Sequence, residues 1–270
     1  MEQELSKILR SSLKINDEKA MKIITNPIYN NIENIMVEGI IKEQLFGDRY
    51  YLHNMPKNCN DSHDLIVFYH GSRDIAWTQT LEYTNFINNK NYLVAFGQAS
   101  GIINKPEIHP EFGYASFGEI FWEIRYGHQQ LTEDILYTRA LVADMKEQYH
   151  INNIYFIGHS NGGVFALLLA IYTPNLFQTI VSHMGGIGYD PDLFLDFNSM
   201  KNNEQRTPIL FYTGENDLHK IPCQSAYKIF KEQKFPVDIF IEKNIGHEYL
   251  SNCEEYLLNW CKKNCNFPNL

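Results

Sequence analysis

The stretch FIGHSNGG, residues 156–163, contains a Gly-x-Ser-x-Gly pattern centred on Ser160. The apolar run 154–157 comes directly before the pattern, and the apolar run 164–171 follows it. These flanks predict a strand, a sharp turn and a helix, with the serine on the turn. Such a turn lifts the hydroxyl out of the sheet, and the glycines let neighbouring backbone pass close by. We therefore interpret Ser160 as a nucleophile; the alternative is an ordinary turn rich in glycine and serine.

A nucleophilic serine needs a base, and the base needs a group that orients it. Asp217 follows the strand-like run 208–213, and His247 follows the strand-like run 237–242. All three candidates come after the carboxyl ends of apolar runs, the edge where open α/β sheets place their chemistry. We expect Ser160, Asp217 and His247 to form a catalytic triad. Glu215, on the same turn as Asp217, is the rival for the acid.

The sequence also predicts two backbone donors for the oxyanion of an acyl transfer. Residues 65–69 read as a strand, and His70-Gly71-Ser72 follows it directly. An N–H from such a loop and the N–H of the residue after the nucleophile form the usual oxyanion hole. We assign these donors to Ser72 and Asn161. His70 is expected to pack behind this loop rather than to act as a base.

The segment from about Leu65 to Trp260 resembles the α/β-hydrolase superfamily. More narrowly, it is similar to the esterase branch that includes polyhydroxybutyrate depolymerase-like and feruloyl-esterase-like proteins. The resemblance rests on the order serine, aspartate, histidine and on the motifs DRYYLHNMP at 48–56, HGS at 70–72, TED at 132–134 and GH at 246–247. It implies a serine hydrolase that cleaves a carboxylic ester through an acyl-enzyme on Ser160. It implies no cofactor.

Apolar spacing along the chain predicts one α/β domain with a helical extension. Residues 1–30 have helical spacing, and residues 31–270 are expected to form a single domain. The runs 35–41 and 48–53 predict antiparallel strands at the start of a central sheet. Beyond them strands and helices alternate, which predicts a mostly parallel sheet with helices on both faces. A helix is expected from about residue 132. Asp134 lies near its start, where a carboxylate interacts favourably with the helix dipole.

Residues 97–130 form an irregular, aromatic-rich segment that we expect to be a wall of the substrate pocket. The pocket residues that we predict are Phe117 and Trp122 in this segment and Met184 on a second short rim. A cluster that only covers the edge of the sheet is the alternative. Several prolines and glycines interrupt the segment, which favours a fixed wall over an amphipathic lid, and hence short acyl groups.

Composition narrows the class of protein further. The chain has 270 residues, 44% of them apolar, a formal charge of −9 and a mean hydropathy of −0.34. The charge argues against nucleic acid or an anionic membrane as partner, and a small-molecule ester is the expected one. Five widely spaced cysteines do not suggest a disulfide framework, and no histidine pairing suggests a metal. The charged start and the lack of long apolar runs lead us to expect a cytoplasmic protein.

Two alternatives to an esterase stay open at this point. A thioesterase or a peptidase would use the same triad and the same oxyanion donors. A non-catalytic binding module on a hydrolase fold is the other alternative, because a fold does not determine a function.

Overall fold

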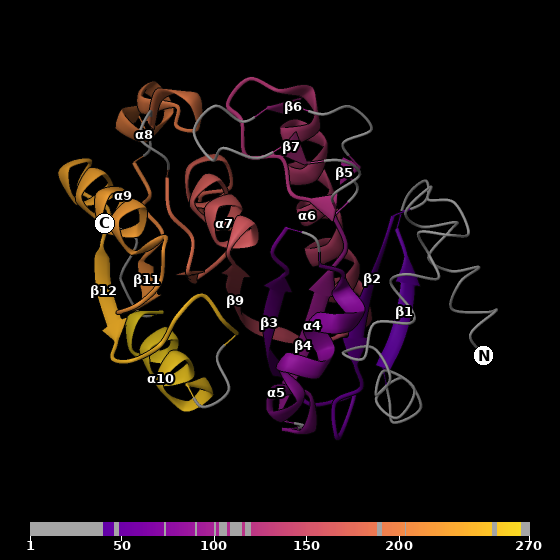
Figure 1. Cartoon of the computed structure of the whole chain (residues 1–270). Helices are drawn as coiled ribbons and strands as arrows, with labels where there is room; N and C mark the ends of the chain where they lie inside the picture. The colour runs from indigo at the N-terminus through magenta and orange to yellow at the C-terminus, as the bar shows by residue number, and fades with distance from the viewer. Residues whose placement is uncertain are drawn as a thin grey trace.

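The computed structural model of the chain has one large β-sheet with helices packed against it (Figure 1). It describes residues 40–45, 49–72, 74–89, 91–99, 101–102, 107–108, 115–116, 120–187, 191–202, 204–249 and 253–265, without the side chains of 78, 81 and 101–120. The predicted helical extension at residues 1–30 lies outside these ranges, and so does Phe117.

Eight strands form the large sheet in the order β1-β2-β4-β3-β9-β10-β11-β12. Their bounds are β1 Ile40–Gln44, β2 Tyr50–Asn54, β3 His63–Tyr69, β4 Tyr92–Gly97, β9 Ile151–His159, β10 Thr179–His183, β11 Ile209–Gly214 and β12 Val237–Glu242. Two short pairs are separate from the large sheet. Strand β5 Gly101–Ile102 pairs with β8 Ile120–Phe121, and β6 Glu107–Ile108 pairs with β7 Ala115–Ser116. The helices are α4 Ala76–Glu82, α5 Thr84–Asn88, α6 Gln129–Gln148, α7 Asn161–Tyr172, α8 Phe197–Asn202, α9 Lys220–Glu232 and α10 Glu254–Asn264, with a 3-10 turn η2 at Pro191–Leu193.

Strand β2 runs antiparallel to both of its neighbours, β1 and β4. The other pairs of the large sheet are parallel. The predicted mostly parallel sheet with antiparallel strands at its N-terminal side is therefore confirmed. One helix boundary differs from the prediction, because α6 begins at Gln129 rather than near residue 132.

Helices α4 and α6 cover opposite faces of the sheet. The chain leaves β3 through α4 to reach β4 on one side, and leaves β4 through α6 to reach β9 on the other side of β3. Parallel connections are almost always right-handed, so crossings in opposite directions put the two helices on opposite faces. Figure 1 shows α4 in front of the strands and α6 behind them. This order also places the ends of β3 and β9 together, with Tyr69 paired with Gly158.

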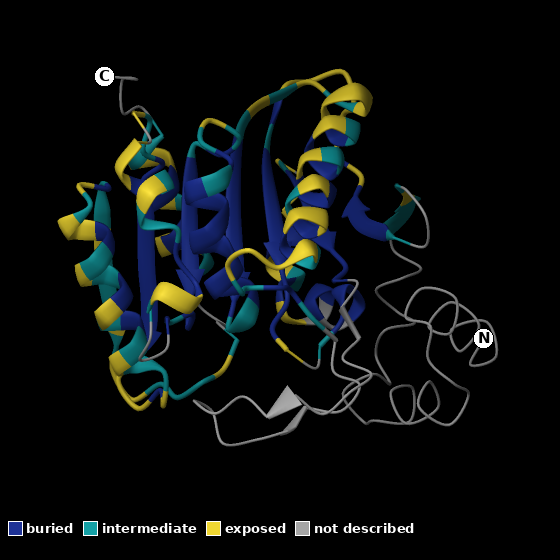
Figure 2. Ribbon diagram, turned by 90° about the horizontal axis from the view of Figure 1, so that it is seen from above, coloured by how far each residue is buried: buried dark blue, intermediate teal, exposed yellow. Residues whose placement is uncertain are grey.

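The core lies along the central strands (Figure 2). Every residue of β10 and β11 is buried, whereas β12 at the edge has only half-buried and exposed residues. Parallel strands that are covered on both faces are buried on both faces, so even the polar residues Thr179, Ser182 and His183 of β10 are buried. Helix α7 is buried from Gly162 to Ile171, which fixes the helix that begins beside Ser160. Among the described helices none is long and apolar enough to cross a membrane.

Candidate active site

The turn between β9 and α7 presents Ser160 at the carboxyl end of the sheet. The backbone of Ser160 has a φ of 52°, in the left-handed region that residues other than glycine rarely adopt. The flanking glycines allow the turn. A Cβ on Gly158 would lie 2.0 Å from the carbonyl oxygen of Gly162, and a Cβ on Gly162 would lie 2.5 Å from that of Tyr69. The glycines of the sequence pattern are thus required by close backbone approach on both sides of the serine.

The loops after β11 and β12 bring Asp217 and His247 to Ser160. His247 Nε2 lies 2.9 Å from Ser160 Oγ, and His247 Nδ1 lies 3.0 Å from Asp217 Oδ1. In this arrangement Nδ1–H donates to the carboxylate, and Nε2 accepts the hydroxyl hydrogen of the serine. The rival acid Glu215 makes a different contact, since its Oε2 accepts the backbone N–H of Asn244 at 3.2 Å. The structure therefore brings together the three residues that the sequence predicts as a triad.

The carboxylate of Asp217 is held in its charged form. Burial of the side chain would raise its pKa, but hydrogen bonds from His247, the His219 backbone N–H and the Thr213 hydroxyl keep the pKa below its ordinary value. The last two bonds measure 2.8 Å and 3.0 Å. A charged carboxylate on Nδ1 can stabilise His247 when the ring takes up a proton.

Three other histidines surround His247 and are kept neutral. His159 and His183 are buried, with their Nδ1 atoms 3.0 Å apart, so one ring donates to the other. Burial lowers the pKa of His183 to about 3 and that of His159 well below its ordinary value. Burial and the nearby His247 also lower the pKa of His219. Among these rings, His247 is the one hydrogen-bonded to both Ser160 and Asp217.

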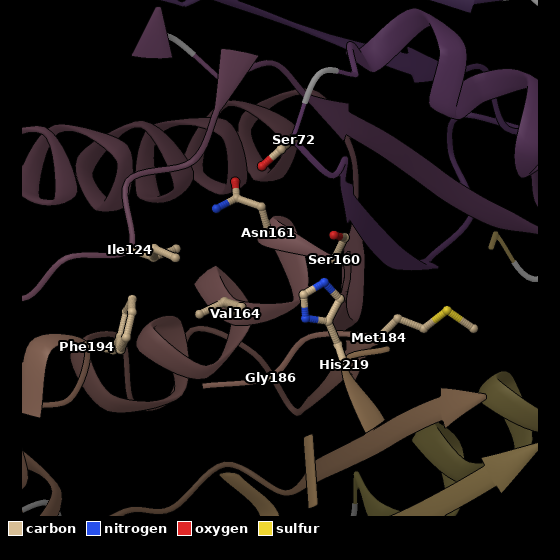
Figure 3. A pocket seen from close by; sticks show the side chains of 9 residues that line it. All are labelled: Ser72, Ile124, Ser160, Asn161, Val164, Met184, Gly186, Phe194 and His219. Atoms are coloured by element: carbon tan, nitrogen blue, oxygen red, sulfur yellow. The ribbon is translucent and has the colours of Figure 1, made fainter. Parts of the chain in front are cut away.

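Ser72 and Asn161 lie beside Ser160 at the pocket (Figure 3). Asn161 is the first residue of α7, and the first N–H groups of a helix have no partner within the helix. The loop that carries Ser72 passes directly beside the nucleophile, because a Cβ on Gly71 would lie 3.1 Å from the Ser160 Cβ. This placement suits the predicted pair of backbone donors, whose role stays a prediction.

His70 packs behind the loop that carries Ser72, as expected. Its Nδ1 donates to the Gly71 carbonyl at 2.8 Å, and its Nε2 accepts the backbone N–H of Ala99 at 3.2 Å. The ring is fully buried, and this burial lowers its pKa to about 4. A neutral ring with both nitrogens engaged holds the loop in place and has no atom available for proton transfer.

A cavity of about 80 Å³ opens beside the nucleophile, lined by Ser72, Ile124, Ser160, Asn161, Val164, Met184, Gly186, Phe194 and His219. Figure 3 shows the apolar side chains of Ile124, Val164 and Phe194 gathered on one side and the His219 ring close to Ser160. Sequence reasoning missed the lining role of His219. The available signal was its position two residues after the predicted acid.

The predicted pocket residues have different outcomes. Met184 lines the cavity, and Phe117 lies outside the described residues. Trp122 is not part of the lining: it is fully buried, its ring stacks on Tyr69 with centroids 3.7 Å apart, and Ile124 lines the cavity in its place. An aromatic-rich stretch does not reveal which side chains face the core, and this one turns its tryptophan inward.

No metal cluster is evident in the part of the chain that the structure describes. Within those residues there is no group of three histidine, cysteine, aspartate or glutamate side chains placed to hold a metal ion.

Comparisons with known proteins agree with this architecture. Residues 125–175, which include Ser160, match the model of a family described as alpha/beta hydrolase of unknown function (DUF915). A protein of Acanthamoeba polyphaga mimivirus, described as an uncharacterized hydrolase, is 27% identical over 234 residues, with 78% of this chain and 74% of that protein covered.

Two solved structures are similar in fold over most of the chain. An S-formylglutathione hydrolase from Agrobacterium tumefaciens has a TM-score of 0.62 at 13% identity, covering 84% of this chain and 95% of that one. A phospholipase/carboxylesterase from Dyadobacter fermentans has a TM-score of 0.55 at 17% identity, covering 83% and 96%. With the sheet order, the helices on both faces and the strand-turn-helix around Ser160, these likenesses show that the chain has the α/β-hydrolase fold.

Proposed function

We propose that the protein is a serine hydrolase that cleaves a small, soluble carboxylic ester. The observation that carries the proposal is the contact chain from Ser160 through His247 to Asp217, beside a cavity. The similar proteins support the same class, since their names include a hydrolase of a virus, an S-formylglutathione hydrolase and a carboxylesterase. The resemblance to the polyhydroxybutyrate depolymerase-like and feruloyl-esterase-like branch stays part of this proposal.

In the first half-reaction, Ser160 Oγ attacks the acyl carbonyl carbon while its proton passes to His247 Nε2. The carbonyl π electrons move to the oxygen, and the N–H groups of Ser72 and Asn161 donate hydrogen bonds to this oxyanion. When the carbonyl re-forms, the ester C–O bond breaks and the alcohol leaves with the proton from His247. The acyl group is now bonded to Ser160.

In the second half-reaction, water attacks the acyl-enzyme and gives its proton to His247. Collapse of the second oxyanion releases the carboxylic acid, and Ser160 Oγ recovers the proton. Asp217 stabilises the charged ring of His247 in both halves. A thioester or an amide would follow the same steps, so matched acetyl ester, thioester and anilide substrates distinguish the three classes.

The nucleophile is tested by a fluorophosphonate label and by the variant Ser160→Ala. We expect wild-type protein to be labelled on Ser160 and to hydrolyse a chromogenic ester. The variant should lose label and about a millionfold in turnover without any change in its unfolding transition. More than a few per cent of residual rate in a pure preparation would show that the nucleophile is another residue. No labelling and no turnover in the wild type would favour a binding module.

The small cavity predicts a preference for short acyl chains. Its volume of about 80 Å³ lies well below the ~300–1,000 Å³ of pockets that enclose drug-sized ligands. Each buried methylene adds about 0.8 kcal/mol of binding, but only while the pocket has room for it. We expect kcat/KM to be highest for the shortest esters and to fall along a series from acetyl to palmitoyl. A steady rise to the longest chain, with activation at an emulsion surface, would contradict the proposed substrate size.

A further inference from the structure

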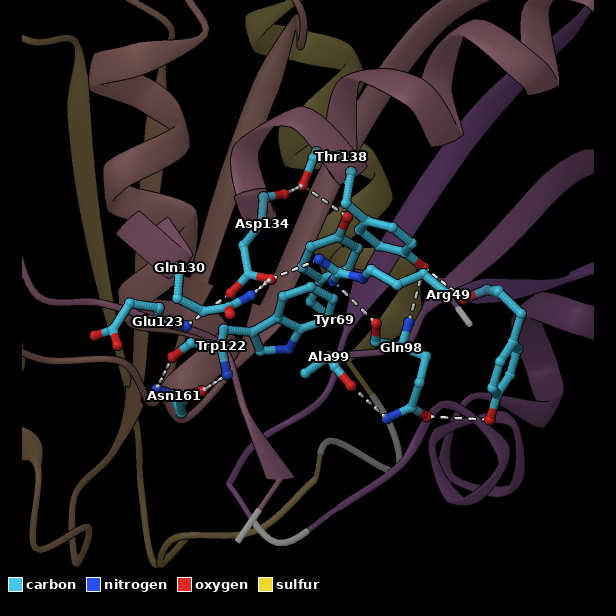
Figure 4. Close-up of polar contacts among 12 residues, drawn as sticks. Arg49, Tyr69, Gln98, Ala99, Trp122, Glu123, Gln130, Asp134, Thr138 and Asn161 are labelled. Atoms are coloured by element: carbon cyan, nitrogen blue, oxygen red, sulfur yellow. Dashed lines mark hydrogen bonds and ion pairs between the residues drawn. The ribbon is translucent and has the colours of Figure 1, made fainter. Parts of the chain in front are cut away.

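Trp122 pairs through its main chain with Asn161, the residue after the nucleophile (Figure 4). The Trp122 N–H donates to Asn161 Oδ1 at 2.6 Å, and Asn161 Nδ2 donates to the Trp122 carbonyl at 3.0 Å. The side-chain amide thus pairs with a single residue of main chain, as a neighbouring strand would. Two hydrogen bonds on one planar group fix its orientation and thereby restrain the first residue of α7.

The side chain of Trp122 contacts the other oxyanion element, the loop after β3. Its indole Nε1 donates to the carbonyl of His70 at 3.1 Å. Its ring stacks on Tyr69 with an interplanar angle of 9°. Tyr69 and His70 lead directly into Ser72, so this one tryptophan bonds to the elements that carry both proposed donors.

The next residue, Glu123, attaches this segment to α6 (Figure 4). The Glu123 N–H donates to Asp134 Oδ2 at 2.9 Å, and Asp134 Oδ1 accepts from Arg49 Nη1 at 2.7 Å. The Asp134 carboxylate is fully buried, and the Arg49 guanidinium lies 3.7 Å from the centre of the Tyr137 ring. Removing one partner of a buried ion pair is costly, because it leaves the other charge buried and uncompensated. The segment that carries Trp122 is therefore fixed to the core.

We propose that Trp122 is a positioning residue that keeps the two oxyanion donors aligned. The inference rests on the proposed function, because it concerns the oxyanion that attack by Ser160 would create. The donors come from loops of two different strands, and they stabilise the oxyanion only if they already point at its position. Trp122 holds Asn161 with its main chain and His70 with its indole, so it sets the separation of the two loops.

The matched variants Trp122→Phe and Trp260→Phe test the inference. Trp122→Phe keeps an aromatic ring on Tyr69 and deletes the indole donor. Trp260→Phe deletes a similar bond elsewhere, because Trp260 of α10 donates its Nε1–H to Oδ2 of Asp238 in β12 at 2.7 Å. We expect both to lower Tm to a similar extent. Trp122→Phe alone should lower kcat, by about tenfold, with KM within a factor of two.

A trifluoromethyl ketone separates alignment of the donors from general loss of structure. Ser160 adds to its carbonyl to give a tetrahedral adduct whose oxygen occupies the oxyanion hole. We expect its Ki to rise in Trp122→Phe in proportion to the fall in kcat/KM, while inhibition by the product alcohol stays unchanged. If Trp122→Phe keeps the wild-type kcat and ketone Ki, the inference is wrong.

A second variant covers the case in which Trp122→Phe fails to fold. Asn161→Ala keeps its backbone N–H but deletes both bonds to Trp122, and its side chain is only half-buried. The same decline in kcat and ketone affinity is expected, and wild-type values would overturn the inference. Failure of the proposed function has a different signature, since wild-type Ser160 would then not react with a fluorophosphonate at all.

Discussion

The base and the oxyanion donors proposed here are supported by two different kinds of structure, although both serve Ser160. The base side consists of Asp217 and His247 on the loops after β11 and β12, and the His247 side chain is 24% exposed. The oxyanion side depends on Trp122 and on the buried pair of Asp134 with Arg49, and both Trp122 and Asp134 are fully buried. On the base side His247 is partly exposed although the Asp217 side chain is buried, whereas Trp122 and Asp134 on the oxyanion side both belong to the core.

The contrast fits the different tasks of the two sides. A histidine base exchanges protons with serine, alcohol and water in turn, and it needs access to all three. Oxyanion donors need to be in position before charge develops, which favours a rigid surrounding. We therefore expect substitutions on the base side to lower activity with little loss of stability, and substitutions on the oxyanion side to lower both.

The largest effect is expected for Asp217→Asn on the base side. An amide at this position favours the wrong tautomer of His247, so turnover should fall by about ten-thousandfold. The free energy of unfolding should fall by at most ~2 kcal/mol, because the Asn oxygen can still accept a hydrogen bond. Ester turnover and urea unfolding of the same preparation measure the two quantities.

Glu215→Gln is the matched control for this prediction. Glu215 lies on the same turn and accepts the Asn244 N–H, and among the described residues its side chain makes no hydrogen bond with the triad. We expect wild-type turnover for this variant. A large loss in Glu215→Gln with activity retained in Asp217→Asn would exchange the roles of the two acids.

On the oxyanion side, Asp134→Ala should lower stability more than any single change on the base side. It leaves the guanidinium of Arg49, whose side chain is 11% exposed, without its carboxylate. Breaking a buried pair in this way costs about 3–5 kcal/mol of unfolding free energy. Activity should also fall, because Glu123 loses the acceptor of its N–H. Glu133→Ala, at an exposed position of the same helix, is the control and should unfold like the wild type. Equal urea unfolding midpoints for Asp134→Ala and Glu133→Ala would contradict the contrast between the base side and the oxyanion side.

The base side could be predicted from sequence, and the reason is local. Ser160, Asp217 and His247 each follow an apolar run, and parallel strands end at one edge of a sheet, so their meeting follows from the order of elements. The turn at Ser160 likewise depends on glycines that stand within two residues of it. The mostly parallel sheet followed from the alternation of strands and helices for the same reason.

The donors Ser72 and Asn161 could be proposed from sequence, but the residues that support them could not, because their contacts join residues far apart in sequence. Asp134 was expected at the start of a helix, facing the dipole. Helix α6 instead begins at Gln129, so Asp134 lies in its second turn, and its buried side chain meets Arg49 from 85 residues away. The pattern of aromatics around Trp122 did not tell whether its ring faces the pocket or the core. The directions of the Asp134 and Trp122 side chains are both decided by the packing of α6 against the strands.

The smallest effect per residue is expected in mild acid, where stability is lost gradually through buried histidines that adjoin both sides. Burial lowers the pKa of His70 to about 4 and that of His183 to about 3, and it also lowers the pKa of His159. In the unfolded chain each of them has a pKa of about 6.5. Below that pH the unfolded state binds more protons than the folded state, so stability falls as pH falls.

Each of these histidines contributes up to about 1.4 kcal/mol of lost stability per pH unit below pH 6.5. Asp74, Glu82 and Asp134 act in the opposite direction, because burial raises the pKa of each carboxyl, that of Asp74 to about 6, and the folded state then takes up a proton first. Burial also lowers the pKa of His53 and His219, so five described histidines oppose these three carboxylates, and we expect the free energy of unfolding in urea to decrease steadily from pH 7 to pH 5. His150→Gln, at an exposed position before β9, should keep the wild-type slope. A stability that is flat or rises over this range would contradict the expectation that the buried neutral histidines dominate the pH dependence.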